Sequence, residues 1–190
     1  MRIYRIDFPP IDRRLCVWAK GFNVKRMQLF DGRPQEGWEE AELEIDGSRP
    51  PVRLDCPYLW GPIPVLSDRA RRALEGLLGG DVEWLPARLE GERYWLANVT
   101  NLVDGLDRER SDCEWLEGEG IIWVREYQMR EAAVDGQAVF KLSDDPLGFP
   151  LVSKEVKRRA EEEGIVGLSF KLAWDSELPP GSVRFDSFLE

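Results

Sequence analysis

Residues 66–86, LSDRARRALEGLLGGDVEWLP, contain a helix and the start of the strand that follows it. Ser67 is a typical N-cap residue, and Asp68 suits the positive end of the helix dipole. Apolar side chains then recur at helical spacing before a glycine stop signal; these residues are Ala70, Ala73, Leu74, Leu77, Leu78, Gly79 and Gly80. The stretch therefore predicts an amphipathic helix of about three turns over residues 68–78.

Short apolar and aromatic segments follow this helix, separated by glycines and turn residues. Residues 82–85, 94–99, 121–124, 138–142 and 168–174 are rich in the side chains that strands favour. Ser153 then precedes a charged segment with a narrow apolar stripe of Val156 and Ala160, which predicts a second helix as far as Glu163. Strands clustered between two helices favour α+β over alternating βαβ units. We therefore predict an α+β fold with a mainly antiparallel sheet of short strands and two principal amphipathic helices.

The first 58 residues have a more irregular pattern. Alternating apolar residues at positions 4–8 and 41–45 predict two strands, and Glu40, Glu42 and Glu44 give the second strand an anionic outer face. Prolines in residues 57–64 indicate a passage into another structural unit. We expect residues 1–58 to form a smaller β-rich N-terminal subdomain, residues 59–175 an α+β core and residues 176–190 a loose tail. Alternatively, the first segment completes the core sheet.

The net charge of the chain indicates which kinds of partner it can bind. The 190 residues carry a net charge of −10, and their hydrophobic content of 43% is sufficient for a core. Negative charge repels phosphate backbones and anionic membranes, so we expect neither nucleic acid nor a membrane as partner. A basic protein is favoured instead, because opposite charge speeds encounter. An acidic composition can also serve solubility alone.

The residue types exclude the commonest catalytic sites. The chain has no histidine, which is the base of Ser-His-Asp and Cys-His sites and a frequent zinc ligand. Cys16, Cys56 and Cys113 lie far apart, without metal-binding or redox spacing, and the glycines form no phosphate-binding motif. We therefore expect no catalytic residue, no metal and no cofactor. Unpaired thiols and the lack of an apolar leader or membrane-spanning run predict a cytoplasmic protein.

One pair of carboxylates supports an enzymatic alternative. Asp104 and Asp107 follow the polar residues 98–101, and together they could serve as a metal or acid–base pair. Such a site needs a deep pocket in which one carboxyl group has a raised pKa. A turn at Asp104 and Gly105 explains the same residues without chemistry. A third alternative is a structural or regulatory module that self-associates through exposed aromatic residues; the sequence leaves the oligomeric state open.

Two tryptophans are each flanked by acidic residues. Trp115 lies in the acidic segment 104–119, and Trp38 stands among glutamates in the segment 36–40. A ring surrounded by carboxylates is a typical way to capture a basic partner, although a solvated loop is the simpler interpretation. The candidate partner-binding residues are Trp38, Glu39, Glu40, Asp107, Asp112, Glu114, Trp115 and Glu117.

The order of the motifs adds a resemblance to a known family. The motifs are L-S-x-R-A-x-x-A-L at 66–74, LLGGDVEWLP at 77–86, Y-x-x-x-NVTN at 94–101, VFKL at 139–142, LVS at 151–153 and GIVGLSF at 164–170. Over roughly residues 60–174 the chain resembles family eleven of the bacterial polymorphic-toxin immunity proteins. This resemblance implies a protein that binds and neutralises a cognate toxin without catalysis, and it supplies no catalytic residues. A basic toxin, such as a nuclease, is an expectation from charge alone.

Overall fold

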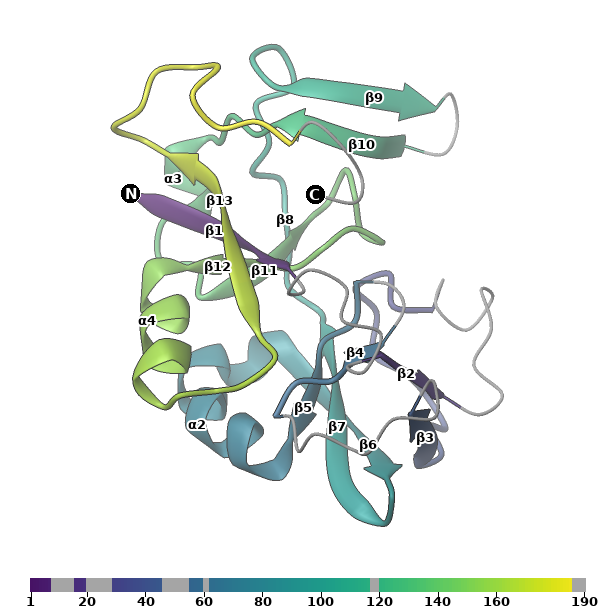
Figure 1. The fold of residues 1–190 in the computed structure, drawn as a ribbon. Coiled ribbons are helices and arrows are strands. Elements are labelled where there is room, and N and C mark those ends of the chain that lie inside the picture. Colours follow the sequence, from purple (N-terminus) through teal and green to yellow (C-terminus); the bar gives the residue numbers. More distant parts are fainter. Residues whose placement is uncertain (8–15, 20–28, 46–54, 60–61, 117–119, 186–190) are drawn as a thin grey trace.

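The computed structural model describes residues 1–7, 16–19, 29–45, 55–59, 62–116 and 120–185, with residues 16–19 described by their backbone only. Two mixed β-sheets, a separate hairpin and two longer helices form this part of the chain (Figure 1). In chain order the elements are β1 (Arg2–Asp7), β2 (Cys16–Ala19), β3 (Ala41–Ile45), β4 (Tyr58–Leu59), β5 (Val65–Ser67), α2 (Asp68–Leu78), the 3-10 turn η2 (Gly79–Asp81), β6 (Val82–Leu89), β7 (Glu92–Val99), β8 (Leu102–Val103), β9 (Asp112–Leu116), β10 (Gly120–Glu126), α3 (Glu131–Val134), β11 (Val139–Leu142), β12 (Leu151–Ser153), α4 (Lys154–Glu162) and β13 (Ser169–Asp175).

Both principal helices begin at the serines that the sequence indicates. The Ser67 hydroxyl accepts a hydrogen bond from the Ala70 N–H, and the Ser153 hydroxyl accepts one from the Val156 N–H. α2 ends at Gly79, whose φ of 55° is positive and therefore favours glycine. The prediction of two amphipathic helices is confirmed.

The strands form one sheet in the order β4-β2-β3-β6-β7-β5 and another in the order β13-β1-β12-β11-β8. Most neighbours are antiparallel, and among the described strands β2–β4, β3–β6 and β8–β11 are parallel. The longest pairing joins β6 to β7 through a two-residue turn at Glu90 and Gly91, where both φ values are positive. The predicted α+β class with mainly antiparallel strands is confirmed.

Strands from the first 58 residues belong to both sheets. β1 lies between β12 and β13, and β3 lies beside β6. In β3 the predicted alternation is present, because Ala41 and Leu43 are buried while Glu42 and Glu44 are exposed. These pairings favour the alternative in which the first segment completes the core sheets. A separate subdomain with a boundary at residue 58 stays a prediction.

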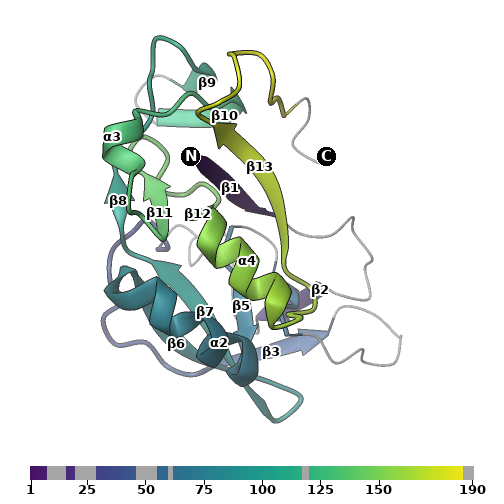
Figure 2. The same cartoon turned by 90° about the vertical axis from the view of Figure 1, so that its left-hand side faces the viewer.

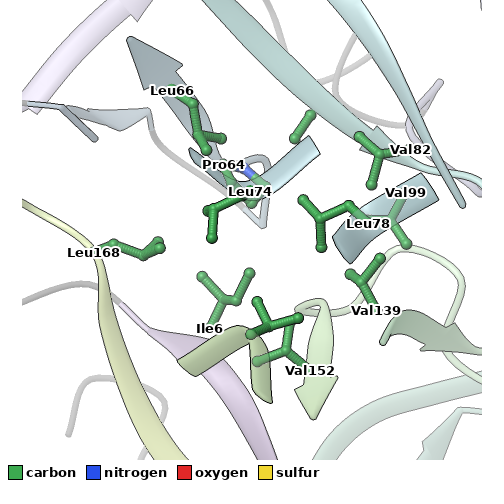
Figure 3. A pocket seen from close by; sticks show the side chains of 12 residues that line it. Ile6, Pro64, Leu66, Leu74, Leu78, Val82, Val99, Val139, Val152 and Leu168 are labelled. Carbon is green, nitrogen blue, oxygen red and sulfur yellow. The ribbon is translucent and has the colours of Figure 1, made fainter. Parts of the chain in front are cut away.

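The two helices pack against each other and cover the region between the sheets (Figure 2). Below them, apolar side chains from both helices and both sheets surround a cavity of about 20 Å³, lined among others by Leu74, Leu78, Val139 and Val152 (Figure 3). A cavity of this size holds at most one water, and its lining offers a water no polar partner. It is therefore a small packing gap in the core and no substrate pocket.

The chain after β13 returns to the β9–β10 hairpin. Phe185 is fully buried with its ring edge-on to Tyr127, and its N–H donates to the Arg125 carbonyl at 2.8 Å. The Arg184 guanidinium pairs with Asp112 and with the buried Glu126. A buried aromatic ring and two ion pairs thus hold residues 184 and 185 against the hairpin, while the loose tail over residues 176–190 stays a prediction.

Candidate functional site

The β9–β10 hairpin forms a two-stranded sheet of its own, at the top of the molecule in Figure 1. Its register is irregular at Ile122 and Arg125, where β10 has one residue more than β9. Such bulges change the direction in which side chains point. Ile121 and Val124 are buried in the core beneath the hairpin, while the bulged Ile122 is exposed. The core therefore holds the hairpin on one side and leaves its other side accessible.

Three large apolar side chains lie exposed where the two strands of the hairpin approach their connection. Trp115 is 45% exposed, Leu116 44% and Ile122 44%. We call these three residues the hairpin patch. Single exposed apolar residues are ordinary on protein surfaces, but several close together mark interaction sites. The patch is consequently the strongest candidate contact surface on the described part of the chain.

The ring of Trp115 has a cationic neighbour from another segment of the chain. The guanidinium carbon of Arg108 lies 5.9 Å from the centroid of the Trp115 ring, within cation–π range. Arg108 is itself fixed by two hydrogen bonds to the Asp144 carboxylate, one of them from Nε at 3.0 Å. The Asp144 carbonyl also accepts the Ile121 N–H at 3.4 Å. The loop of residues 143–148 thus supports both the hairpin and its exposed tryptophan, which lowers the entropy lost on binding.

The acidic residues of the hairpin are compensated by arginines of the same chain. Asp112 pairs with Arg184 at 2.6 Å and with Arg125 at 3.7 Å, and Arg125 also donates to Glu114 at 2.6 Å. Exposed ion pairs of this kind each contribute little to stability. Their effect here is to surround the patch with both signs of charge. The sequence predicts a ring surrounded by carboxylates, and the structure adds these arginines to its surroundings.

The second predicted cluster has a different environment. Trp38 is half-buried, its Nε1–H donates to the Pro86 carbonyl at 3.1 Å, and its ring is edge-on to Phe30. Glu40 pairs with Arg88 at 2.6 Å, whereas Glu39 is exposed and has no ion pair among the described residues. β3, which follows this segment, lies at the opposite end of the molecule from β9 (Figures 1 and 2). The two predicted groups therefore do not form one site.

Two predicted partner-binding residues remain: Asp107 stabilises a turn, and Glu117 is not among the residues that the structure describes. The carboxylate of Asp107 accepts the Arg110 N–H at 3.2 Å and its carbonyl accepts the Ser111 N–H at 2.9 Å, so Asp107 shapes the turn before β9. Glu117 lies outside the described residues.

Asp104, one of the two carboxylates of the enzymatic alternative, forms an ion pair at the surface. The Asp104 side chain is 63% exposed and pairs with Arg130, and this hydrogen bond lowers the pKa of Asp104. A general acid needs the opposite shift. Among the described residues, no three metal-ligating side chains are grouped together.

A cleft of about 440 Å³ lies elsewhere, between the start of β1, the loop after α3 and the first turn of α4. Its volume is within the range of small-ligand sites. The charged residues that line it are Arg2, Asp135, Lys154 and Glu155, and Arg2 is already paired with Asp175 at 2.7 Å. Neither Asp104 nor the hairpin patch contributes to this cleft.

Sequence reasoning missed the buried Lys141 and the half-buried Asp145, whose charges interact. Lys141 is only 2% exposed, and its Nζ donates to the Phe30 carbonyl at 2.7 Å and to the Pro146 carbonyl at 3.1 Å. Burial lowers the pKa of Lys141 to about 8, and burial raises the pKa of Asp145 to about 6. The available signal was a lysine in the middle of an apolar strand, at 139–142. Lys141 joins the segment before β3 to the loop that supports Trp115.

Comparisons with known proteins agree with the resemblance seen in the motifs. No helix in the described ranges is both long and apolar enough to cross a membrane. A search of curated proteins finds no match. The family model described as "Immunity protein family (Imm11)" matches residues 38–175, from Trp38 to the end of β13, and this range includes the whole hairpin. This match extends over more than half of the sequence, and the chain therefore belongs to the Imm11 immunity protein family.

Proposed function

We propose that this protein is a non-catalytic immunity protein that binds a cognate bacterial toxin in the cytoplasm and neutralises it by covering a functional surface. Family membership supports the general role, and the hairpin patch is the observation that carries the mode of action. To cover a functional surface of the toxin, the protein needs sufficient affinity and a complementary shape. It does not need to catalyse a reaction. The two thiols that the structure describes as free, Cys56 and Cys113, suit a reducing compartment.

The patch has the composition of a binding centre. Tryptophan is strongly enriched among residues that dominate binding energy, and such residues act best when they are already held in position. Trp115 meets both conditions, because it is exposed and lies within cation–π range of Arg108. Leu116, which follows Trp115 in β9 and points to the other face of the strand, and Ile122 on β10 add exposed apolar area at the same end of the hairpin, and the ion pairs of Asp112 and Glu114 form a polar border. Complementary charge in this border would favour the correct partner over others.

The net charge supports a basic toxin as partner. A charge of −10 attracts a positively charged protein over distances near the Debye length, and it repels the nucleic acid that a nuclease would bind. We therefore expect the rate of association to fall as salt is added. A partner whose association rate is independent of salt would contradict the basic assignment.

A titration of toxin activity tests the function directly. The protein encoded next to this chain is purified, and its activity is measured with increasing amounts of the chain. Stoichiometric binding predicts that inhibition is complete near one chain per toxin. Complete inactivation by far fewer chains would show catalysis, and lack of any inhibition would reject the proposed function.

Two variants locate the surface in the same titration. Trp115→Ala should require a large excess of chain, whereas Val166→Ala, at a residue that is 52% exposed and follows α4, should behave as the wild type. Light scattering of the free chain separates this account from self-association, since a dimer that is lost in Trp115→Ala would show that a second copy covers the patch.

A further inference from the structure

We propose that the toxin binds by β-strand addition, with an extended segment of the toxin pairing with the outer edge of β9. This inference rests on the proposed function and specifies the partner's chemistry: an extended backbone with apolar side chains at the positions that meet the hairpin patch. Main-chain hydrogen bonds would supply affinity, and the flanking side chains would supply specificity.

The outer edge of β9 has unused backbone groups. β9 pairs with β10 on one side, and among the described residues Asp112–Leu116 make no other backbone hydrogen bond. The far edge of β10, in contrast, is occupied at Arg125, whose carbonyl accepts the Phe185 N–H. A strand edge with free N–H and C=O groups is a template for another chain. Within the part of the chain that the structure describes, the hairpin therefore has one edge that is already used, on β10, and one edge without a backbone partner, on β9.

The irregularities of the hairpin leave this open edge regular. Both bulges, at Ile122 and Arg125, are on β10, and the five residues of β9 continue without one. Bulges are a common means of protecting an edge from pairing, and β9 does not have this protection. A two-stranded sheet is also only marginally stable in water. A third strand would complete the hairpin on the side that faces away from the core.

The side chains of β9 define what the added strand must contain. Successive strand residues point to opposite faces, so Trp115 and Leu116 offer an apolar contact on each face of the extended sheet. The carboxylate of Glu114 is already compensated by Arg125. The added segment therefore needs no basic residue opposite Glu114, and cross-strand apolar pairs would stabilise it.

A second sheet edge in the same molecule serves as an internal control. β13 is the outermost strand of its sheet, and within the described residues its only strand partner is β1, while the carbonyl of its last residue, Asp175, accepts the Leu178 N–H at 3.1 Å. All seven of its residues are at least partly buried, and none is among the large apolar residues exposed at the surface. β13 thus has an open edge without an apolar patch. We expect the toxin to leave it unoccupied.

Amide hydrogen exchange, resolved residue by residue by NMR, tests the inference on the wild-type chain. Exchange is measured for the free chain and for its complex with the protein encoded beside it. In a strand, alternate N–H groups point to opposite edges, so strand addition should slow exchange at every second residue of β9 by at least about tenfold. The amides of β13 should not change.

Each outcome of this experiment has one meaning. Alternating protection along β9 supports strand addition. A complex in which exchange slows elsewhere, or uniformly over β9 and β10, overturns strand addition and leaves the proposed function intact. If no complex forms with the neighbouring protein, the proposed function fails and strand addition fails with it.

Discussion

Trp38 and Trp115 have nearly the same neighbours in the sequence and opposite roles in the fold. Both stand among glutamates or aspartates. Trp38 packs edge-on to Phe30 and donates its indole N–H to the Pro86 carbonyl, whereas Trp115 is exposed on a hairpin and lies within cation–π range of Arg108. The difference shows that acidic neighbours do not decide whether a tryptophan is available to a partner. Burial by distant segments decides it.

The two regions are nevertheless connected through Lys141. Its ammonium group binds the carbonyl of Phe30, which contacts Trp38, and the carbonyl of Pro146, in the loop that supports Trp115. Any test that separates a structural tryptophan from a binding tryptophan should therefore include this lysine.

The largest expected effect on stability is that of Lys141→Met. The substitution leaves the Phe30 and Pro146 carbonyls without their donor and leaves Asp145 without its nearby positive charge, so we expect the free energy of unfolding to fall by about 3 kcal/mol or more. Urea denaturation measures it, with the exposed Lys154→Met as the control.

The double variant Lys141→Met, Asp145→Asn tests the cause. Because it removes both charges, it should be more stable than the single Lys141→Met variant. A loss under about 1 kcal/mol in the single variant would mean that Lys141 does not join the two regions.

Truncation of the two tryptophans should separate their structural roles. We expect Trp38→Ala to lower the free energy of unfolding by about 3 kcal/mol, because it removes core packing around Phe30 and a hydrogen bond to Pro86. Trp115→Ala should cost less than about 1 kcal/mol, since nearly half of that side chain is exposed. Both values come from urea denaturation under the same conditions, and equal losses would contradict the distinction.

The free energy of unfolding should depend on pH because of Asp145. Its pKa in the folded chain is about 6, above the ordinary value of 3.8, because burial disfavours the charged form. The stabilising contribution of the protonated group is therefore complete below pH 4 and is lost as the pH rises through 6. Relative to Asp145→Asn, the wild type should lose about 2 to 3 kcal/mol of unfolding free energy across this window.

Denaturation of both proteins at a series of pH values measures this difference. The comparison with Asp145→Asn cancels the titration of the other carboxylates. A difference between the two proteins that stays constant from pH 4 to pH 7 would show that Asp145 ionises as freely in the fold as in the unfolded chain.

The smallest expected effect on the free energy of unfolding is that of a substitution at Val139, which lines the apolar cavity. Val139→Ile adds a methylene beside the apolar cavity of about 20 Å³, and filling it should raise the free energy of unfolding by about 0.5 kcal/mol. Affinity for the toxin should not change. A loss above about 1 kcal/mol would show that the gap cannot accept the added group.

Local features of this fold could be predicted from the sequence, and long-range ones could not. The caps Ser67 and Ser153 and the alternation of β3 depend on neighbouring residues, and all are present. The place of β1 between β12 and β13 depends on segments from the far end of the chain, and no local pattern specifies such partners. The sequence alone therefore leaves open whether residues 1–58 form a subdomain or complete the core sheets.

The candidate site shows this limit as well. The sequence placed Trp115 in an acidic segment, but the arginines that compensate those acids, Arg125 and Arg184, come from β10 and the tail. The sequence groups Trp38 with Trp115 because their neighbours are similar. It does not reveal the packing of Phe30 against Trp38 or the hydrogen bond from Trp38 to the Pro86 carbonyl. Contacts between distant residues created both differences.

The affinity of Trp115→Ala for the toxin tests the central claim most directly. Calorimetric titration of the protein encoded beside this chain should give a dissociation constant about 30-fold higher for Trp115→Ala than for the wild type, whereas Trp38→Phe, which keeps a core aromatic ring, should bind as the wild type does. If Trp115→Ala binds with unchanged affinity, the hairpin patch is not the surface through which this protein recognises its toxin.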